Sequence, residues 1–262
     1  MARRQARRPR QAGQAQGRRP AGAAVSALPG FDPRAAAGTA SQPLRIRVWD
    51  LPTRLFHWAL AACIVASVVS AKIGGNAFAW HFRFGYAILA LALFRLAWGF
   101  VGPRYARFAS FPPNPAAAWR RLRAGSAPAE DVGHGPLGAL STYAMLASIV
   151  LQAGTGLFAS DDILWDGPLK DSVSNATSQM LTGVHLVNRY VLIALIVLHL
   201  AAIAWYARVR RRPLVRAMID GDLALAAPQA SPPAPAADSA RVRAGALVLL
   251  AASAAVVWAI VR

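Results

Sequence analysis

Apolar residues along this chain are gathered into long blocks separated by short polar segments. Four blocks run roughly over 55–71, 80–101, 137–158 and 181–207. Each is close to the ~20 residues that a helix needs to cross a hydrocarbon core about 30 Å thick. The charged fraction is 15%, below that of an average soluble domain. The pattern predicts an all-α protein built on a transmembrane four-helix bundle.

A fifth apolar block lies at the C-terminal end of the sequence. It extends without a charged residue over 244–261 and is followed by Arg262. The run is rich in alanine, and its 18 residues are near the lower limit for a membrane-spanning helix. We expect a fifth, C-terminal transmembrane helix.

Composition divides the chain into four parts. Residues 1–45 are rich in Arg, Gln, Ala, Gly and Pro and contain too few apolar residues to fold, which predicts a disordered basic tail. This tail does not resemble a signal peptide, because no apolar segment directly follows its arginines. Residues 46–212 form the main transmembrane domain, 213–241 a Pro/Ala-rich linker, and 242–262 the additional helix.

The formal net charge of +18 would by itself be typical of a nucleic-acid-binding protein. The arginines, however, either precede the first apolar block or flank the later ones, as membrane topology requires. We therefore expect contact with membrane lipid and none with nucleic acid.

The distribution of charge also predicts an orientation. The N-terminal segment, the 102–136 loop and the residues after Arg208 are rich in arginine, whereas the 159–180 loop has four aspartates and one lysine. Basic loops stay in the cytoplasm. The protein should cross the membrane several times with a cytoplasmic N-terminus and with the 159–180 loop outside.

Residues at the predicted helix ends agree with this topology. Three prolines should prevent regular structure in the 102–136 loop: Pro112, Pro113 and Pro115. Four aromatic residues at helix ends are predicted to lie at the membrane interface: Trp80, Trp98, Trp205 and Tyr206.

The sequence contains a single cysteine, Cys63, inside an apolar block. It excludes an intramolecular disulfide and cysteine-ligated clusters, and no C-x-x-C-H motif is present for covalent attachment of a c-type haem.

Four histidines lie in or at the ends of the predicted helices, where ionisable groups are costly and usually functional. His57 begins the first helix at the cytoplasmic side, and His81 begins the second at the outer side. His185 is near the outer side of the fourth helix, and His199 lies 14 residues further along it, about 21 Å deeper. Depth therefore pairs His81 with His185 and His57 with His199.

Fourteen residues are close to four helical turns, so His185 and His199 project from nearly the same helix face. One helix can thus give a ligand to each of two stacked sites. Haem iron takes two axial ligands, and facing imidazoles in a bundle suit it. We interpret the two pairs as ligands of two b-type haems; a lone histidine would more simply bond a neighbouring helix.

Two further features of the second helix suit a haem. Gly85, Ala92 and Gly99 share the face of His81 and could admit a flat macrocycle, although small residues also favour close helix packing. Arg95 is on the same face at the cytoplasmic level and could pair with a haem propionate, or else extend to the interface. We expect His134, in the loop, to face solvent or a quinone.

Several segments resemble the prokaryotic cytochrome b561 family, which includes cytochrome b subunits of nickel–iron hydrogenases and is related to the gamma subunits of formate dehydrogenases. The similarity covers about 46–208. The matching segments are Val48–Trp58, His81–Tyr86, Phe94–Pro103, Gly133–Ala139 and Gly154–Phe158, together with His185 and His199.

This resemblance implies a four-helix core with two b haems, whose ligands match His57, His81, His185 and His199. It implies a component of an oxidoreductase in the bacterial cytoplasmic membrane that exchanges electrons between an outer partner and quinone. The partner would be a hydrogenase-type subunit or a periplasmic c-type cytochrome. The acidic outer loop would suit docking of a basic c-type cytochrome. This resemblance is compatible with a homo-oligomer or a hetero-oligomer.

Three alternatives make different predictions. A transporter that uses intramembrane histidines needs a continuous polar path and broken helices, and the first, third and fourth apolar blocks have few charges or internal prolines. A stand-alone oxidoreductase of the same fold, acting on superoxide and quinone, would be active without a partner. A structural anchor would be colourless.

Overall fold

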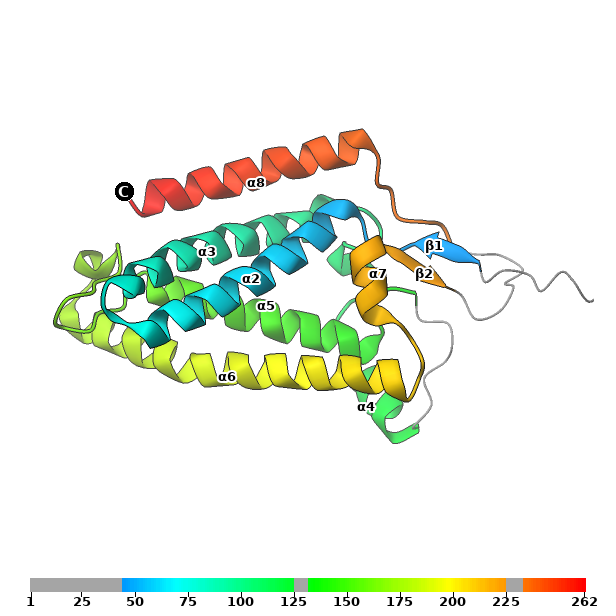
Figure 1. Ribbon diagram of the computed structural model, residues 1–262, viewed down its shortest axis with the longest axis horizontal. Helices are drawn as coiled ribbons and strands as arrows, with labels where there is room; N and C mark the ends of the chain where they lie inside the picture. Colours follow the sequence, from blue (N-terminus) through cyan, green and yellow to red (C-terminus); the bar gives the residue numbers. More distant parts are fainter. Residues whose placement is uncertain (1–43, 125–131, 225–232) are drawn as a thin grey trace, which may run out of the picture. The chain divides into compact units, whose positions relative to one another are not determined.

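The computed structural model describes residues 44–124, 132–224 and 233–262, all of which belong to the unit Pro43–Arg262. In these segments five helices are long and apolar enough to cross a membrane (Figure 1). They are α2 (Leu51–Ile73), α3 (Phe78–Val101), α5 (Pro136–Gly156), α6 (Asn175–Arg208) and α8 (Ala240–Ile260). The predicted all-α membrane fold, with four helices and a fifth at the C-terminus, is confirmed.

The helices alternate in direction, so the connecting segments gather at two ends of the molecule. These two ends differ in charge. The first residues of α2, α5 and α8 and the last residues of α3 and α6 lie together, as Figure 1 shows, and we call this the basic end. The other end carries the turn between α2 and α3 and the aspartate-rich segment between α5 and α6, and we call it the acidic end.

Packing places α3 between three neighbours, because it lies against α2, α5 and α8, while α5 also packs on α6. At the centre of the bundle, four buried residues meet, one from each of α2, α3, α5 and α6: Leu60, Ala92, Ile149 and Leu192. The fifth helix packs on the far side of α3, where Val257 and Ala246 of α8 join separate buried clusters. The outer face of α6 is left exposed, with apolar residues such as Val187 and Leu198, as expected for a surface that faces lipid.

The start of α2 is fixed by a buried carboxylate. Asp50 is fully buried in extended conformation and accepts hydrogen bonds from the Thr53 amide (2.9 Å) and the Thr53 hydroxyl (2.8 Å). The indole of Trp98 donates to the same carboxylate at 3.2 Å. Trp98 is only 3% exposed, so its side chain does not face lipid as an interfacial tryptophan would: the bond to Asp50 and stacking on Phe94 hold it inside the protein.

The loop after α3 is more regular than predicted, because it contains η3 (Phe108–Ser110) and α4 (Pro115–Ala124). Pro115 begins α4 instead of preventing it. The first helical residue needs no amide hydrogen, and the fixed φ of proline suits that position. Asn114 accepts a hydrogen bond from the Ala117 amide at 2.8 Å and so caps the helix.

The segment predicted as a Pro/Ala linker also forms structure. It contains α7 (Leu214–Asp220) and the strand β2 (Asp222–Ala224), which pairs antiparallel with β1 (Arg45–Arg47). Ala217 and Leu223 are buried in one cluster with residues of the β1 segment and Tyr105, which explains why this stretch is ordered. Two short 3-10 turns complete the described elements, η2 (Gly75–Ala77) and η4 (Lys170–Ser172). Residues 1–43 of the predicted basic tail and 225–232 of the predicted linker lie outside the described residues.

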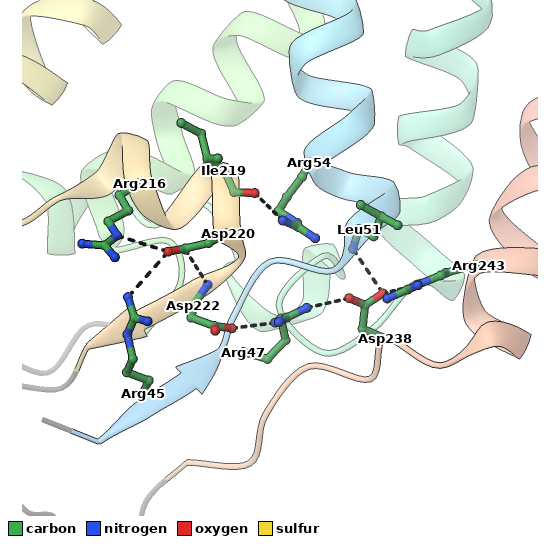
Figure 2. A network of polar contacts seen from close by, with 10 residues as sticks. All are labelled: Arg45, Arg47, Leu51, Arg54, Arg216, Ile219, Asp220, Asp222, Asp238 and Arg243. Carbon is green, nitrogen blue, oxygen red and sulfur yellow. Dashed lines mark hydrogen bonds and ion pairs between the residues drawn. The ribbon is translucent and has the colours of Figure 1, made fainter. Parts of the chain in front are cut away.

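A network of ion pairs joins these segments at the basic end (Figure 2). Arg47 of β1 donates to Asp222 of β2 (2.6 Å) and to Asp238, just before α8 (2.9 Å). Asp238 also accepts from Arg243 of α8 (3.0 Å) and from the amide of Leu51 at the start of α2 (3.3 Å). One carboxylate thus connects β1, the start of α2 and α8.

This carboxylate should make stability depend on pH. Burial alone would raise the pKa of Asp238, but hydrogen bonds from Arg243, Leu51 and Arg47 outweigh it and lower the pKa. The bonds therefore stabilise the fold above the ordinary aspartate pKa of 3.8 and are lost as the pH falls below it. At neutral pH, Asp238→Asn should lower the free energy of unfolding by about 1–3 kcal/mol.

The measurement is thermal unfolding of the detergent-solubilised protein at several pH values. The difference between wild type and Asp238→Asn should shrink as the pH is lowered through the acid range. Asp171→Asn is the matched control, because the Asp171 side chain is 97% exposed and its loss should change little. Equal effects of the two substitutions would show that the network does not stabilise the fold.

Candidate functional site

The four histidines of the helices lie in two pairs, one toward each end of the bundle. The rings of His57 on α2 and His199 on α6 have centroids 6.5 Å apart, toward the basic end. The rings of His81 on α3 and His185 on α6 have centroids 6.2 Å apart, toward the acidic end. Because α6 is one continuous helix, it carries a histidine of each pair, as their depths predict.

The spacing of each pair fits two ligands of a single metal ion. An imidazole nitrogen lies about 2 Å from a bound transition metal, and the ring centre about 1 Å further, so rings on opposite sides of one metal are about 6 Å apart. The measured 6.2 and 6.5 Å agree with this arrangement. The histidines of each pair also lie on helices whose backbones are not in extensive contact. These are α6 and α2 for one pair, and α6 and α3 for the other.

Neither pair has the surroundings of a bare metal site. Within the described part of the chain, no three His, Cys, Asp or Glu side chains gather closely enough to hold an ion. A protein-bound zinc or copper ion normally needs three or four such donors. A site with two imidazoles and nothing else suits a metal whose other ligands are supplied by a macrocycle.

Hydrogen bonds orient the acidic-end pair. The Nδ1 atom of His185 lies 2.9 Å from the main-chain oxygen of Gln152, and that of His81 lies 2.9 and 3.1 Å from the hydroxyl and the carbonyl oxygen of Ser67. A carbonyl oxygen can only accept, so the hydrogen of His185 is on Nδ1. Nε2 then keeps its lone pair, which is the state that a metal ligand needs.

The basic-end pair has no comparable support. Nδ1 of His57 is buried and has no hydrogen-bond partner among the described residues. An acceptor or a ligand that fixes this ring is therefore not supplied by the described protein atoms, and the two pairs differ in their immediate surroundings.

Arg95 provides a buried positive charge with one unpaired donor atom near the basic end. Its side chain is 4% exposed, its guanidinium lies 5.0 Å from the ring centre of Phe108, and its NH1 atom has no hydrogen-bond partner among the residues described. The alternative that Arg95 extends to the membrane interface is wrong, because packing encloses it. A buried arginine with a free donor fits an anionic group such as a haem propionate.

The stripe of small residues on α3 divides into two parts. A Cβ atom on Gly85 would meet no other atom within 4 Å, so there is open space one turn from His81. A Cβ on Gly99 would collide with the ring of Phe108, and Ala92 is fully buried among the helices. Close packing therefore explains Ala92 and Gly99, and only Gly85 fits a neighbouring macrocycle.

His134 is half-buried and its Nδ1 atom is enclosed, so it is not the solvent-facing residue that one of its two predicted roles required. Its ring lies against Trp49 and Phe111, with centroids 4.8 and 4.3 Å apart. Burial, together with the charge of Arg95, lowers the pKa of His134 to about 3. His134 is thus uncharged at neutral pH and belongs to neither histidine pair.

Sequence reasoning did not connect His185 with the residues that position it: Gln152 was not singled out, and Thr155 and Gly156 were noted only as part of the matching segment Gly154–Phe158. Gln152 and Thr155 contact its ring nitrogen, and Gly156 lies so close that an added Cβ would be 3.0 Å from the ring. One signal was available: Gln152 is an amide in the middle of an apolar block. Its partner helix, however, could not be known before the bundle was assembled.

Comparisons with known proteins agree with these features. The family model described as prokaryotic cytochrome b561 matches residues 48–221. A protein of Azotobacter chroococcum mcd 1 named "Probable Ni/Fe-hydrogenase B-type cytochrome subunit" is 25% identical over 210 residues, 67% of this chain and 87% of that protein. The "Probable Ni/Fe-hydrogenase 1 B-type cytochrome subunit" of Escherichia coli (strain K12) is 24% identical over 140 residues, 43% of this chain and 60% of the other.

No solved structure matches the chain. The family model nevertheless covers the four core helices and all four paired histidines. On this match the chain belongs to the prokaryotic cytochrome b561 family and is a multi-pass membrane cytochrome of the b type, a haem protein of electron transfer.

Proposed function

We propose that this cytochrome holds two b haems, one between His57 and His199 and one between His81 and His185. The observation that carries the proposal is the spacing of the rings, 6.5 and 6.2 Å between centroids, which suits one iron between each pair. The lone pairs left on Nε2 of the acidic-end histidines support it. Arg95 would pair with a propionate at the basic-end site, and Gly85 would leave room beside His81.

We further propose that the basic end faces the cytoplasm and the acidic end faces outward from the bacterial inner membrane. Arginines follow α3 and α6 and precede α2, whereas aspartates gather between α5 and α6. Positive loops are retained in the cytoplasm. In this orientation His81 and His185 form the outer site, His57 and His199 form the inner site, and the N-terminus is cytoplasmic.

The proposed role is electron transfer between an outer-face redox partner and membrane quinone. Haem iron held by both imidazoles of a pair would have no open position, so the group would change oxidation state without binding substrate. The imidazoles hold the two sites at fixed depths, the apolar helices exclude water, and Arg95 balances negative charge. Quinone takes up two electrons and two protons, so two successive transfers reduce one molecule.

A hydrogenase-type subunit is the partner that we propose first, because the relatives are named as hydrogenase cytochrome subunits. A periplasmic c-type cytochrome with basic residues is the second candidate, on the basis of the aspartates between α5 and α6. Activity with superoxide and quinone in the absence of any partner would instead favour the stand-alone oxidoreductase.

The direct test is the absorption spectrum of the purified protein with haem counted per chain. We expect two b haems per chain, with spectra in both oxidation states typical of six-coordinate iron, and reoxidation of the reduced protein by added quinone. A colourless preparation would support a structural anchor or a transporter. A single haem would show that one of the two histidine pairs is not a binding site.

A further inference from the structure

We propose that a buried polar network between α5 and α6 holds His185 as a strong ligand and gives the outer site the lower reduction potential of the two. This inference rests on the proposed function, because it assumes a haem at each histidine pair. It assigns Gln152 and Asn188 as positioning residues, which act on the iron through His185.

The network surrounds Gln152 with hydrogen bonds. The Nδ2 atom of Asn188 donates to the Gln152 side-chain oxygen (2.8 Å) and to the Ser148 carbonyl (2.9 Å), and the Ser148 hydroxyl donates back to Asn188 (3.0 Å). The Gln152 side chain in turn donates to the main-chain oxygen of His185 at 3.1 Å. Ser148 and Asn188 are each 6% exposed, so water cannot replace these bonds.

The result is a reciprocal pair of bonds between Gln152 and His185. The Gln152 side-chain NH2 group donates to the main-chain oxygen of His185, and the main-chain oxygen of Gln152 accepts the Nδ1 hydrogen of the His185 ring at 2.9 Å. Thr155 is a further contact of Nδ1, at 3.4 Å. Both the position and the rotation of this imidazole are therefore determined by α5.

Such a bond has a known effect on a metal ligand. Donation of the Nδ1 hydrogen to a carbonyl raises the electron density on Nε2 and makes the imidazole a stronger donor. A stronger donor stabilises the ferric state more than the ferrous state, because the ferric ion carries the larger charge. The reduction potential at the outer site falls accordingly. His81, whose Nδ1 lies within hydrogen-bond distance of two oxygen atoms of Ser67, contributes in the same direction.

The inner site lacks this effect. The buried Nδ1 of His57 has no acceptor among the described residues, and no hydrogen bond joins the ring of His199 to any of them. The buried cation of Arg95 also raises the potential on this side, partly offset by Asp50. Arg189, one turn after His185, raises the potential at the outer site in the same way, so each site has one arginine beside it: the Arg189 Nε atom is buried without a hydrogen-bond partner among the described residues, and its NH2 atom bonds the exposed Tyr190 at 2.9 Å. The ligand hydrogen bonds are thus the main difference between the sites.

The order of potentials has a direct consequence for the direction of transfer. An electron that enters at the outer site loses free energy on reaching the inner site. The protein itself then favours transfer from an outer donor toward the cytoplasmic side of the membrane.

The test is a redox titration of the purified two-haem protein, followed by absorption. His199→Ala, which keeps only the outer ligand pair, identifies the outer wave, and His81→Ala identifies the inner one. We expect the outer wave at the lower potential. Asn188→Leu should raise the outer wave alone, because the Gln152 side chain loses its anchor and no longer holds the main chain of His185 firmly in the position where its ring donates to the Gln152 main-chain oxygen. Gln152→Leu, a second variant in case Asn188→Leu does not assemble, should have the same effect.

Ser253→Ala is the matched control. Ser253 is a buried membrane serine on α8 that bonds only within its own helix, to Leu249 at 2.9 Å, and its loss should move neither wave. The inference is overturned if the haem left in His199→Ala has the higher potential, or if loss of the network moves both waves or neither. Fewer than two haems in the wild-type protein would instead contradict the proposed function.

Discussion

Replacement of His199 by alanine is expected to leave one haem per chain and to remove the inner site. His57→Ala should have the same effect, and the double variant should lose no more than either single one, because a macrocycle that has lost one axial imidazole is no longer clamped between helices. His81→Ala and His185→Ala should remove the other haem. The measurement is haem content by a pyridine haemochrome assay, with protein quantified separately.

The fifth histidine of the chain is the control for these substitutions. His134 is packed between Trp49 and Phe111 and belongs to neither pair, so His134→Ala should retain both haems. If His199→Ala also retained two haems, or if His57→Ala and His199→Ala removed different ones, the assignment of ligands would be wrong.

Substitution of Arg95 should have the second-largest effect of those predicted here. It should weaken haem retention at the inner site and leave the outer site unchanged. Arg95→Leu removes the buried cation with the free NH1 donor, and loss of such a supporting group typically weakens a metal site by about 10–100-fold. Arg95→Lys keeps the charge but not the planar pair of donors, so its rate of haem loss should lie between those of the wild type and Arg95→Leu. The measurement is the rate at which haem is lost to an added haem-binding protein.

An arginine on the same helix is available for comparison. Arg83 is exposed and lies over the ring of Trp80 at 4.6 Å, so Arg83→Leu should leave haem loss unchanged. If Arg95→Leu lost haem faster from the outer site, or if haem loss were unchanged at both sites, Arg95 would have no role in holding a propionate of the inner haem.

The parts of the fold that depend on local pattern could be predicted from the sequence. Apolar length identified five membrane helices, and helical geometry correctly placed His185 and His199 on one face at two depths. Those properties depend on the rise and turn of a helix, which are the same in any protein. The start of α6 at Asn175, six residues before the apolar block, reflects the Ser174 cap, which accepts from the Thr177 amide.

Contacts between distant segments could not be predicted in this way. Strands β1 and β2 are three residues each and pair across most of the chain, so neither has a detectable pattern of its own. Trp98 is at a helix end, where tryptophan usually meets the interface, and only the buried Asp50 explains its place. The hydrogen-bond partners of the histidines depend similarly on which helices become neighbours.

The unbroken course of α6 has one more consequence. Under the proposed ligation, the gap that an electron must cross between the two irons is encoded as a count of residues, 14 from His185 to His199. A single inserted residue would swing one imidazole by about 100° around the helix axis and carry it off its iron. The number of residues in this stretch therefore sets the distance over which an electron tunnels between the two sites.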